Sequence, residues 1–258
     1  MQVTVTYEQP PGEGGSSGPV SVGWLRVSDK GAVLYDPPTR LASRDVARTH
    51  AKSASRCPAV IQMESRYFVV PCPFDLHLGF ARDAKGKAGF VNRAGNASAI
   101  RNTKLNEVLV MVNEAEWRYP DRPTIQLMLP YLFIADEPVW LTQLGAFAHY
   151  RKDPLPGTIF GGRFPISLWP RPIMWAFEWH EPEKDLILHR GEPLFYCQFE
   201  GPSPERPIQL VEAERTPELQ SYIEAISGAV NYVNQTFSLF RAAEAMRPKT
   251  LLVPKTRA

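Results

Sequence analysis

The sequence predicts a mainly β protein, a compact barrel or sandwich that carries a basic helix near the N-terminus and a long C-terminal helix. Short apolar runs separated by turn-forming residues recur along most of the chain, which is typical of strands. The 25 prolines, about twice the usual share of about 5%, lie between these runs and exclude long helices there. Only the C-terminal part combines a helical apolar period with a helix start signal.

These observations predict one compact body with an attached helix. The 258 residues are within the size that a single β core can serve. We expect a β-rich core domain over residues 1–210, in which residues 19–56 contain a hairpin and the basic helix. Residues 211–258 then form a C-terminal helix and tail packed on the core.

The N-terminal region predicts strands. Residues 2–8 alternate polar and β-branched side chains, which indicates a strand, and residues 10–18 are a loop rich in glycine, proline and serine. Residues 20–27 and 31–35 form two further β-like runs joined across Ser28, Asp29 and Lys30, so a hairpin is the simplest prediction.

Residues 39–55 contain alanine, arginine and serine, and a basic side chain recurs at every fourth position around them. On a helix this spacing places the charges in a stripe that winds slowly around the axis. Two interpretations remain open, a solvated helix face and a contact surface for an acidic protein partner. The members of this basic stripe are Arg40, Arg44, Arg48, Lys52 and Arg56.

The middle of the chain continues as a β-meander with strand spacing typical of sandwiches and barrels. Asp83, Lys85, Gly86 and Lys87 supply a hairpin turn within residues 82–89. The expected strands are residues 59–63, 67–70, 75–80, 107–112, 124–129, 131–135 and 139–144.

The stretch from residue 158 to residue 201 is the densest in apolar segments. Ile173, Trp175, Phe177 and Trp179 alternate with other residues, so one face of that strand is almost wholly aromatic. Strands at 186–188 and 194–199, joined by a turn containing a glycine, complete a predicted three-stranded core.

The same aromatics have two interpretations. Core packing is favoured, because a buried sheet face needs such residues. Alternatively they line a pocket for a flat or apolar small molecule. The candidate pocket residues are Trp169, Trp175, Phe177, Trp179 and Arg163.

The C-terminal helix has a clear start. Thr216 is a good N-cap, Pro217 suits the first helical position, and Glu218 complements the helix dipole. The apolar stripe that follows must pack on the sheet or on another chain, which would make a homo-oligomer, and Pro248 marks its end. The stripe contains Ile223, Ile226, Val230, Val233, Phe237 and Phe240.

The histidines are the candidate metal ligands. A mononuclear iron or zinc site would take two or three of them with a carboxylate, but none has the His-x-Asp or His-x-Glu spacing. Convergence in the fold could still assemble a divalent metal site, and capping of polar turns is the competing interpretation. The candidate ligands are His77, His149, His180, His189 and Asp75, with Asp153, Glu181 and Glu192 as further carboxylates.

Charge and cysteine content limit the kinds of partner and the cellular compartment that can be expected. A formal charge of +2 does not predict a nucleic-acid or membrane partner. The cysteines, Cys57, Cys72 and Cys197, are odd in number and lack a CxxC spacing, which argues against a disulfide framework and indicates a reducing interior. No signal-peptide pattern and no apolar run of about 18 residues occurs, so a cytoplasmic location is expected.

Several short motifs occur in order: Arg56-Cys57-Pro58, residues 71–75 (Pro-Cys-Pro-Phe-Asp), Leu129-Pro130 and residues 189–194 (His-Arg-Gly-Glu-Pro-Leu). Over about residues 37–200 they make the chain resemble a family of uncharacterised proteins from bacteria and marine phages. That resemblance implies a compact β fold and no known activity. The turn at Gly191-Glu192 with its flanking strands also resembles the closing hairpin of the deoxyuridine triphosphatase β-barrel, although the upstream aspartate segment of that family has no counterpart here.

Two function classes follow. The first is a small-molecule enzyme or metabolite-binding protein with an aromatic-walled pocket, which the histidines could make metal-dependent. The alternative is a non-catalytic assembly or interaction protein of a phage or multiprotein particle. The sequence contains neither a Gly-x-Ser-x-Gly elbow nor a phosphate-binding glycine motif, and it identifies no catalytic residue.

Overall fold

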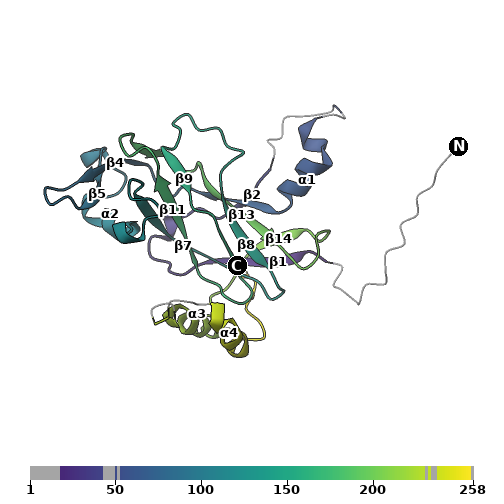
Figure 1. The fold of residues 1–258 in the computed structure, drawn as a ribbon. Coiled ribbons are helices and arrows are strands. Elements are labelled where there is room, and N and C mark those ends of the chain that lie inside the picture. The colour runs from purple at the N-terminus through teal and green to yellow at the C-terminus, as the bar shows by residue number, and fades with distance from the viewer. Residues whose placement is uncertain (1–17, 43–49, 51–52, 230–231, 234–236, 257–258) are drawn as a thin grey trace.

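The computed structural model describes residues 18–42, 50, 53–229, 232–233 and 237–256 (Figure 1). With 35% strand and 21% helix, and with one sheet curled into a half-barrel, it confirms the predicted mainly β class. The expected strand at residues 2–8 lies outside the described residues.

The largest sheet has six strands. Its order is β14 (Ile208–Glu212), β1 (Val20–Arg26), β7 (Thr124–Ile134), β11 (Pro172–Trp179) and β9 (Gly157–Ile159), and β6 (Leu109–Met111) also pairs with β7. The β1–β14 pair is parallel and the other pairs are antiparallel.

Two smaller sheets complete the β structure. The five-stranded sheet has the order β10 (Gly162–Pro165), β8 (Trp140–Gly145), β13 (Pro193–Glu200), β3 (Tyr67–Pro71) and β2 (Thr39–Arg40). The three-stranded sheet has the order β12 (Leu186–Leu188), β4 (Leu76–Arg82) and β5 (Ala88–Asn92).

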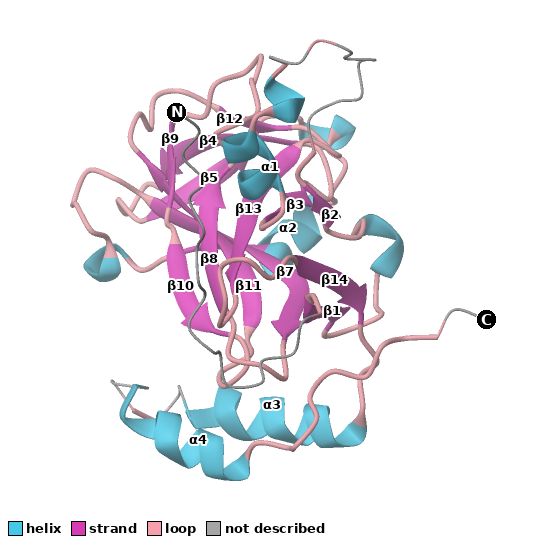
Figure 2. Cartoon of the chain, turned by 90° about the vertical axis from the view of Figure 1, so that its right-hand side faces the viewer, coloured by secondary structure: helices cyan, strands magenta, loops and turns pink. Residues whose placement is uncertain are grey.

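The helices are short. The described α-helices are α1 (Pro58–Glu64), α2 (Asn102–Val108), α3 (Pro217–Ala229) and α4 (Phe240–Met246). The 3-10 turns are η1 (Ala32–Leu34), η2 (Ala54–Arg56), η3 (Gly95–Ala97), η4 (Glu114–Glu116) and η5 (Phe237–Leu239). The helices α3 and α4 lie beside one another at one end of the sheets (Figures 1 and 2).

The main core contains the aromatic face of β11. Trp175, Phe177 and Trp179 are each at most 1% exposed, and the rings of Trp175 and Phe177 stack with centroids 5.0 Å apart. Phe199 of β13 packs against Phe133 of β7 at 5.3 Å, so residues of the six-stranded and five-stranded sheets meet in this core. The alternation along residues 173–179 therefore serves packing.

A second apolar cluster lies beneath α3. Leu219, Tyr222, Ile223 and Ile226 are buried there against side chains of β1, β7 and the segment at Leu251 and Leu252. The N-cap at Thr216 is formed, because its Oγ1 accepts a hydrogen bond of 3.2 Å from the backbone N–H of Leu219. The apolar face of α3 is thus occupied by its own chain.

The hairpin expected at residues 20–35 is not formed. The second run folds as η1, and β1 pairs instead with β7 and β14. Most residues of β1 are buried, so both edges of this strand need partners. Gly23 suits such a central place, because a Cβ there would lie 2.9 Å from Ile134 and close to Ala213.

Two further segments have a secondary structure other than the one predicted from the sequence. The run at residues 59–63 is part of α1, because Pro58 occupies the first turn and favours a helix start. A basic helix was expected over residues 39–55, but the first two of these residues lie in β2 and the last two lie in η2. Residues 43–49 and 51–52 lie outside the described part of the chain.

The three strands of the predicted core do not pair with one another, although side chains of all three are buried in the main core. The strands β11, β12 and β13 belong to three different sheets, and β12 pairs only with β4 among the described strands. The C-terminal helical region also differs from one long helix, since α3 ends at Ala229 and α4 begins at Phe240. Val230 of the predicted stripe is outside the described residues.

Candidate functional site

The predicted metal ligands do not form a metal site. Among the described residues, no group of three or more histidine, cysteine, aspartate or glutamate side chains is placed to hold a metal ion. His77 pairs instead with Asp185, with 2.8 Å between Nε2 and Oδ2, and Arg93 contacts the same carboxylate at 3.2 Å.

His180 belongs to another cluster. Its Nε2 lies 2.8 Å from Oε1 of Glu178, a buried carboxylate, and Arg122 approaches the same oxygen at 3.5 Å. The second oxygen of Glu178 and the hydroxyl of Thr124 are buried without hydrogen-bond partners among the described residues. Glu178 and Thr124 face each other across β11 and β7, so this cluster joins neighbouring strands.

The predicted pocket aromatics lie in separate places. Trp175, Phe177 and Trp179 are in the main core, whereas Trp169 packs against Phe240 at 5.4 Å in the second cluster. The guanidinium of Arg163 is stacked 5.1 Å from the Trp140 ring and pairs with Glu200. These five candidates therefore do not line one common pocket.

The described members of the basic stripe are also apart. Arg40 donates a hydrogen bond of 2.6 Å to the carbonyl of Ile208 and lies over the Phe68 ring, whereas Arg56 is exposed in η2. Arg44, Arg48 and Lys52 lie outside the described residues, so an acidic partner surface there stays a prediction.

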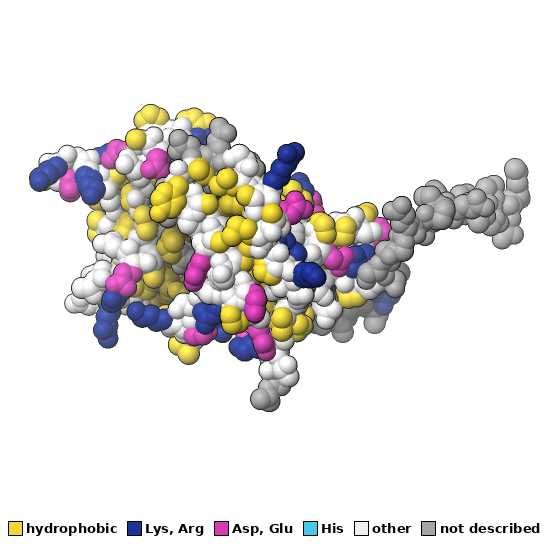
Figure 3. Space-filling model, turned by 90° about the horizontal axis from the view of Figure 1, so that it is seen from below, with side chains coloured by type: hydrophobic (Ala, Val, Ile, Leu, Met, Phe, Trp, Pro, Cys, Tyr) yellow, Lys and Arg dark blue, Asp and Glu magenta, His cyan; other side chains and the backbone are white. Residues whose placement is uncertain are grey.

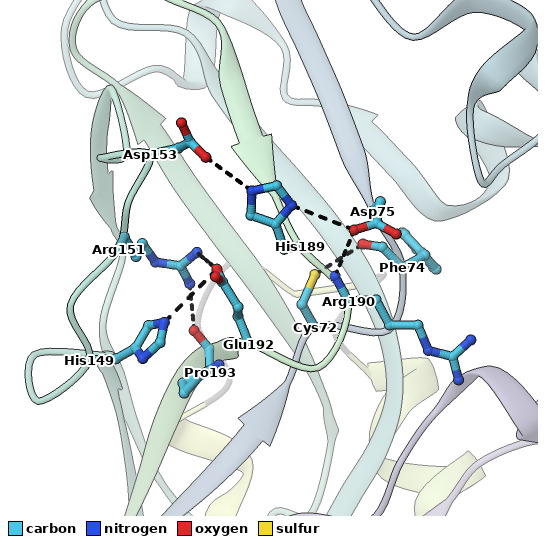
Figure 4. A network of polar contacts seen from close by, with 10 residues as sticks. All are labelled: Cys72, Phe74, Asp75, His149, Arg151, Asp153, His189, Arg190, Glu192 and Pro193. Atoms are coloured by element: carbon cyan, nitrogen blue, oxygen red, sulfur yellow. Dashed lines mark hydrogen bonds and ion pairs between the residues drawn. The ribbon is translucent and has the colours of Figure 1, made fainter.

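The turn between β12 and β13 gathers most of the remaining candidates, namely His149, His189, Asp75, Asp153 and Glu192, whereas Glu181 pairs with Lys184 (Figure 4). Gly191 has a φ of 80°, which glycine adopts without strain. The N–H of Cys72 donates to the carbonyl of Glu192 at 2.8 Å, and the N–H of Gly191 donates to the carbonyl of Cys72 at 2.9 Å. These bonds hold the turn against the connection between β3 and β4.

His189 lies between two carboxylates in this turn. Its Nε2 is 3.1 Å from Asp153, and its Nδ1 is 3.6 Å from Asp75 (Figure 4). The hydrogen bond to Asp153 raises the pKa of His189 above its ordinary value, and the charge of Glu192 adds to the effect. The imidazolium form therefore ties the turn to two separate loops.

Arg151 holds the other side of the turn. Its side chain is only 10% exposed, and it contacts Glu192 at 3.1 Å and the carbonyl of Pro193 at 2.5 Å. His149 approaches the same Glu192 carboxylate, but the 3.9 Å separation is too long for a hydrogen bond. The Nε2 of His149 is buried and has no hydrogen-bond partner among the described residues.

Two grooves meet at His149. The larger has a volume of about 1110 Å³ and lies between α1, β2 and the turn, and its walls include Val60, Met63 and Tyr196. The smaller, about 610 Å³, is lined by the segment after β8 and by β9, including Leu155 and Ile159. His149 lines both grooves. The smaller one is lined mainly by apolar side chains, as small-molecule sites are, whereas the walls of the larger one also carry the charged side chains of Arg40, Glu64, Arg190 and Glu192.

The cysteine near this turn is not activated. Burial raises the pKa of Cys72 to about 12, and its thiol donates to the carbonyl of Phe74 at 3.2 Å. Burial also raises the pKa of Cys197. Because the thiolate is the nucleophilic form, neither buried cysteine is suited to covalent catalysis at neutral pH.

The sequence does not predict the role of Arg151. It predicts Asp153 and Glu192 as carboxylate partners for histidine, but only as metal ligands. The available signal was the polar run from His149 to Asp153 between two apolar strands, because polar residues that are buried need partners.

Comparison with known proteins gives no relative. No family model, no curated protein and no solved structure matches this chain. None of the described helices has the length and apolar character needed to cross a membrane.

The raised pKa of His189 predicts a pH-dependent contribution to stability. Since the folded pKa is above the unfolded value of about 6.5, the contribution is complete below that pH and is lost as the pH rises through the folded pKa. We expect the urea midpoint of the wild type to fall more over this interval than that of His189→Gln. Asp153→Asn should flatten the profile similarly, and parallel profiles for all three proteins would contradict this role.

Proposed function

We propose that this chain is a metabolite-binding protein whose ligand lies in the groove at His149. The observation that carries the proposal is the buried Nε2 of this histidine, which lacks a hydrogen-bond partner among the described residues at the junction of two grooves. A buried polar atom without a partner is costly, and a ligand atom that pairs with it would remove that cost.

The walls of the groove suggest the chemical class. Val60 and Met63 offer apolar contact, and the hydroxyl-bearing Tyr196 and the Glu192 carboxylate offer polar contact. A small molecule with an apolar or aromatic body and one polar group directed at His149 fits these walls. Since residues 189–194 resemble the hairpin of deoxyuridine triphosphatases, nucleosides and nucleotides belong among the candidates.

Binding is a better proposal than turnover. The two buried cysteines are thiols, His189 is engaged by carboxylates, and the Nε2 of His149 has no hydroxyl or thiol partner among the described residues. A binding site needs only shape and complementary polar groups, which this groove has.

The test is a thermal-shift screen of the purified chain against nucleosides, nucleotides, amino acids and carboxylic acids, followed by calorimetry of each hit. We expect His149→Ala to weaken the binding of a hit by about tenfold, which corresponds to about 1.4 kcal/mol for one hydrogen bond. The matched control is His77→Ala, which removes a histidine that lines neither groove.

Unchanged affinity in His149→Ala, or an equal loss in the control, would place the ligand elsewhere. A screen without a hit would count against metabolite binding as such.

A further inference from the structure

The groove at His149 carries two polar groups that lie side by side without bonding to each other. The Nε2 of His149 is buried and has no hydrogen-bond partner among the described residues, and Oε2 of Glu192 is 3.9 Å away (Figure 4). That separation is too long for a direct hydrogen bond. A third group placed against both of them would therefore satisfy the imidazole and contact the carboxylate at once.

The carboxylate of Glu192 is held in place by Arg151. The side chain of Arg151 is only 10% exposed, and its Nη1 donates to Oε2 of Glu192 at 3.1 Å. The other oxygen, Oε1, has no hydrogen-bond or ion-pair partner within the described part of the chain, and Glu192 lines the larger groove. As a carboxylate paired with arginine, Glu192 accepts hydrogen bonds and donates none.

The neighbouring carboxylate also decides which nitrogen of neutral His149 carries the proton. A neutral imidazole has one N–H donor and one lone-pair acceptor. A lone pair on Nε2 would face the negative charge of Glu192 at 3.9 Å, whereas an N–H there faces it favourably. The wall of the groove thus presents a donor beside an acceptor.

A donor beside an acceptor matches only some ligand groups. The oxygen of a hydroxyl can accept from the imidazole and donate to the carboxylate, and an amide offers a carbonyl oxygen beside an N–H. A ligand carboxylate or phosphate can accept from His149, but its oxygens then face the like charge of Glu192. The pair therefore discriminates against an anionic group at this position.

We propose that the groove selects its ligand through a neutral hydroxyl or amide group that bridges His149 and Glu192. This inference rests on the proposed function, because it names the polar group by which the metabolite is held. Val60 and Met63 of α1 receive the apolar or aromatic body of the ligand. The expected ligands are then nucleosides, aromatic amides and similar hydroxyl- or amide-bearing compounds, in contrast to carboxylic acids.

The opposite end of the molecule is a second place to which compounds with an apolar body could adhere. The helices α3 and α4 lie at the other end from α1 (Figures 1 and 2). Seen from that end, hydrophobic side chains lie among charges of both signs (Figure 3). A compound bound there is indifferent to Glu192, so a variant of this residue distinguishes the two places.

Matched pairs of an amide and its acid test the inference, namely nicotinamide with nicotinate and indole-3-acetamide with indole-3-acetate. Ligand-observed NMR titrations at neutral pH give a Kd for each compound. We expect the wild type to bind each amide about tenfold more tightly than its acid, and Glu192→Gln to abolish this preference, mainly by binding the acids better. The matched control, Glu64→Gln, removes the same charge from another wall of the groove and should keep the preference.

The nitrogen resonances of the histidine rings give a second readout, which does not depend on a variant of Glu192. The chain has five histidines, and His149→Gln identifies the Nε2 resonance of His149. Each amide should move this resonance and leave that of His77, which lines neither groove, in place.

Two results would contradict the inference in different ways. Equal affinities for amide and acid in the wild type, together with a moved His149 resonance, would overturn the selection of neutral groups but leave a ligand in the groove. A His149 resonance that none of the compounds moves would count against both this inference and the proposed function.

Discussion

Replacing Phe177 by alanine is expected to lower the free energy of unfolding by about 3–5 kcal/mol, the range for an aromatic residue removed from a packed core. Phe177 is 0% exposed, stacks on Trp175 with a centroid distance of 5.0 Å, and meets Trp179 edge-on at 6.3 Å. Alanine would leave a cavity between two tryptophans that cannot both move to fill it.

Urea denaturation followed by far-UV circular dichroism measures this effect. Met128→Ala is the control, because Met128 is 40% exposed on neighbouring β7 and its truncation should cost less than about 1 kcal/mol. If the alanine variant does not fold, Phe177→Leu should fold with a loss of about 1 kcal/mol. Similar values for Phe177→Ala and Met128→Ala would contradict the placement of Phe177 at the centre of the core.

Replacing Ile226 by alanine is expected to cost about 2–5 kcal/mol and to leave the molar mass in solution unchanged. Ile226 is 4% exposed and packs in the second cluster beneath α3. Its contribution is therefore to the stability of a single chain, because its apolar surface is already covered by its own sheet.

Val233 makes the matched comparison within the same predicted apolar stripe. It is 38% exposed, and Val233→Ala should change the unfolding free energy by at most about 0.5 kcal/mol. Light scattering and denaturation of both variants distinguish packing from self-association. A lower molar mass for Ile226→Ala without a loss of stability would show that this residue contacts another chain.

The local sequence pattern is sufficient to predict much of the β structure. The alternation at residues 173–179 predicts both the strand and the buried face, and the glycine and aspartate between Arg82 and Gly89 predict the turn between β4 and β5. In that turn, Asp83 accepts hydrogen bonds from the N–H groups of Lys85 and Lys87, and Gly86 has a φ of 80°. These signals are carried by residues close in sequence, which is why they can be read without the fold.

The pairing of strands into sheets cannot be predicted from residues that are close in sequence. The strands β11, β12 and β13 follow one another along the chain, yet each joins a different sheet. The choice of partner depends on which faces the whole molecule buries, and a single segment contains no record of that. For residues 59–63 the apolar run fitted a strand, but the helix start given by Pro58 prevailed.

The same distinction applies to the candidate sites. Residue type alone marks the histidines and carboxylates at the turn as candidates, but His189 and Asp153 are 36 residues apart, and the sequence predicts them only as metal ligands. Only the fold shows that His189 lies between Asp153 and Asp75, whereas the Nε2 of His149 is buried without a hydrogen-bond partner among the described residues. The groove at His149 was equally invisible in the sequence, since its walls come from α1, β2, β13 and the segment after β8.

The parallel pairing of β1 with β14 has a consequence for synthesis on the ribosome. Residue 20 of β1 aligns with residue 208 of β14, and β1 finds its other partner, β7, only near residue 134. At a translation rate of about 5–20 residues per second, β1 waits roughly 10–40 s for its last partner to emerge. The apolar strand Val20–Arg26 therefore has an unpaired edge for that time, which leaves it open to wrong pairing until β14 emerges.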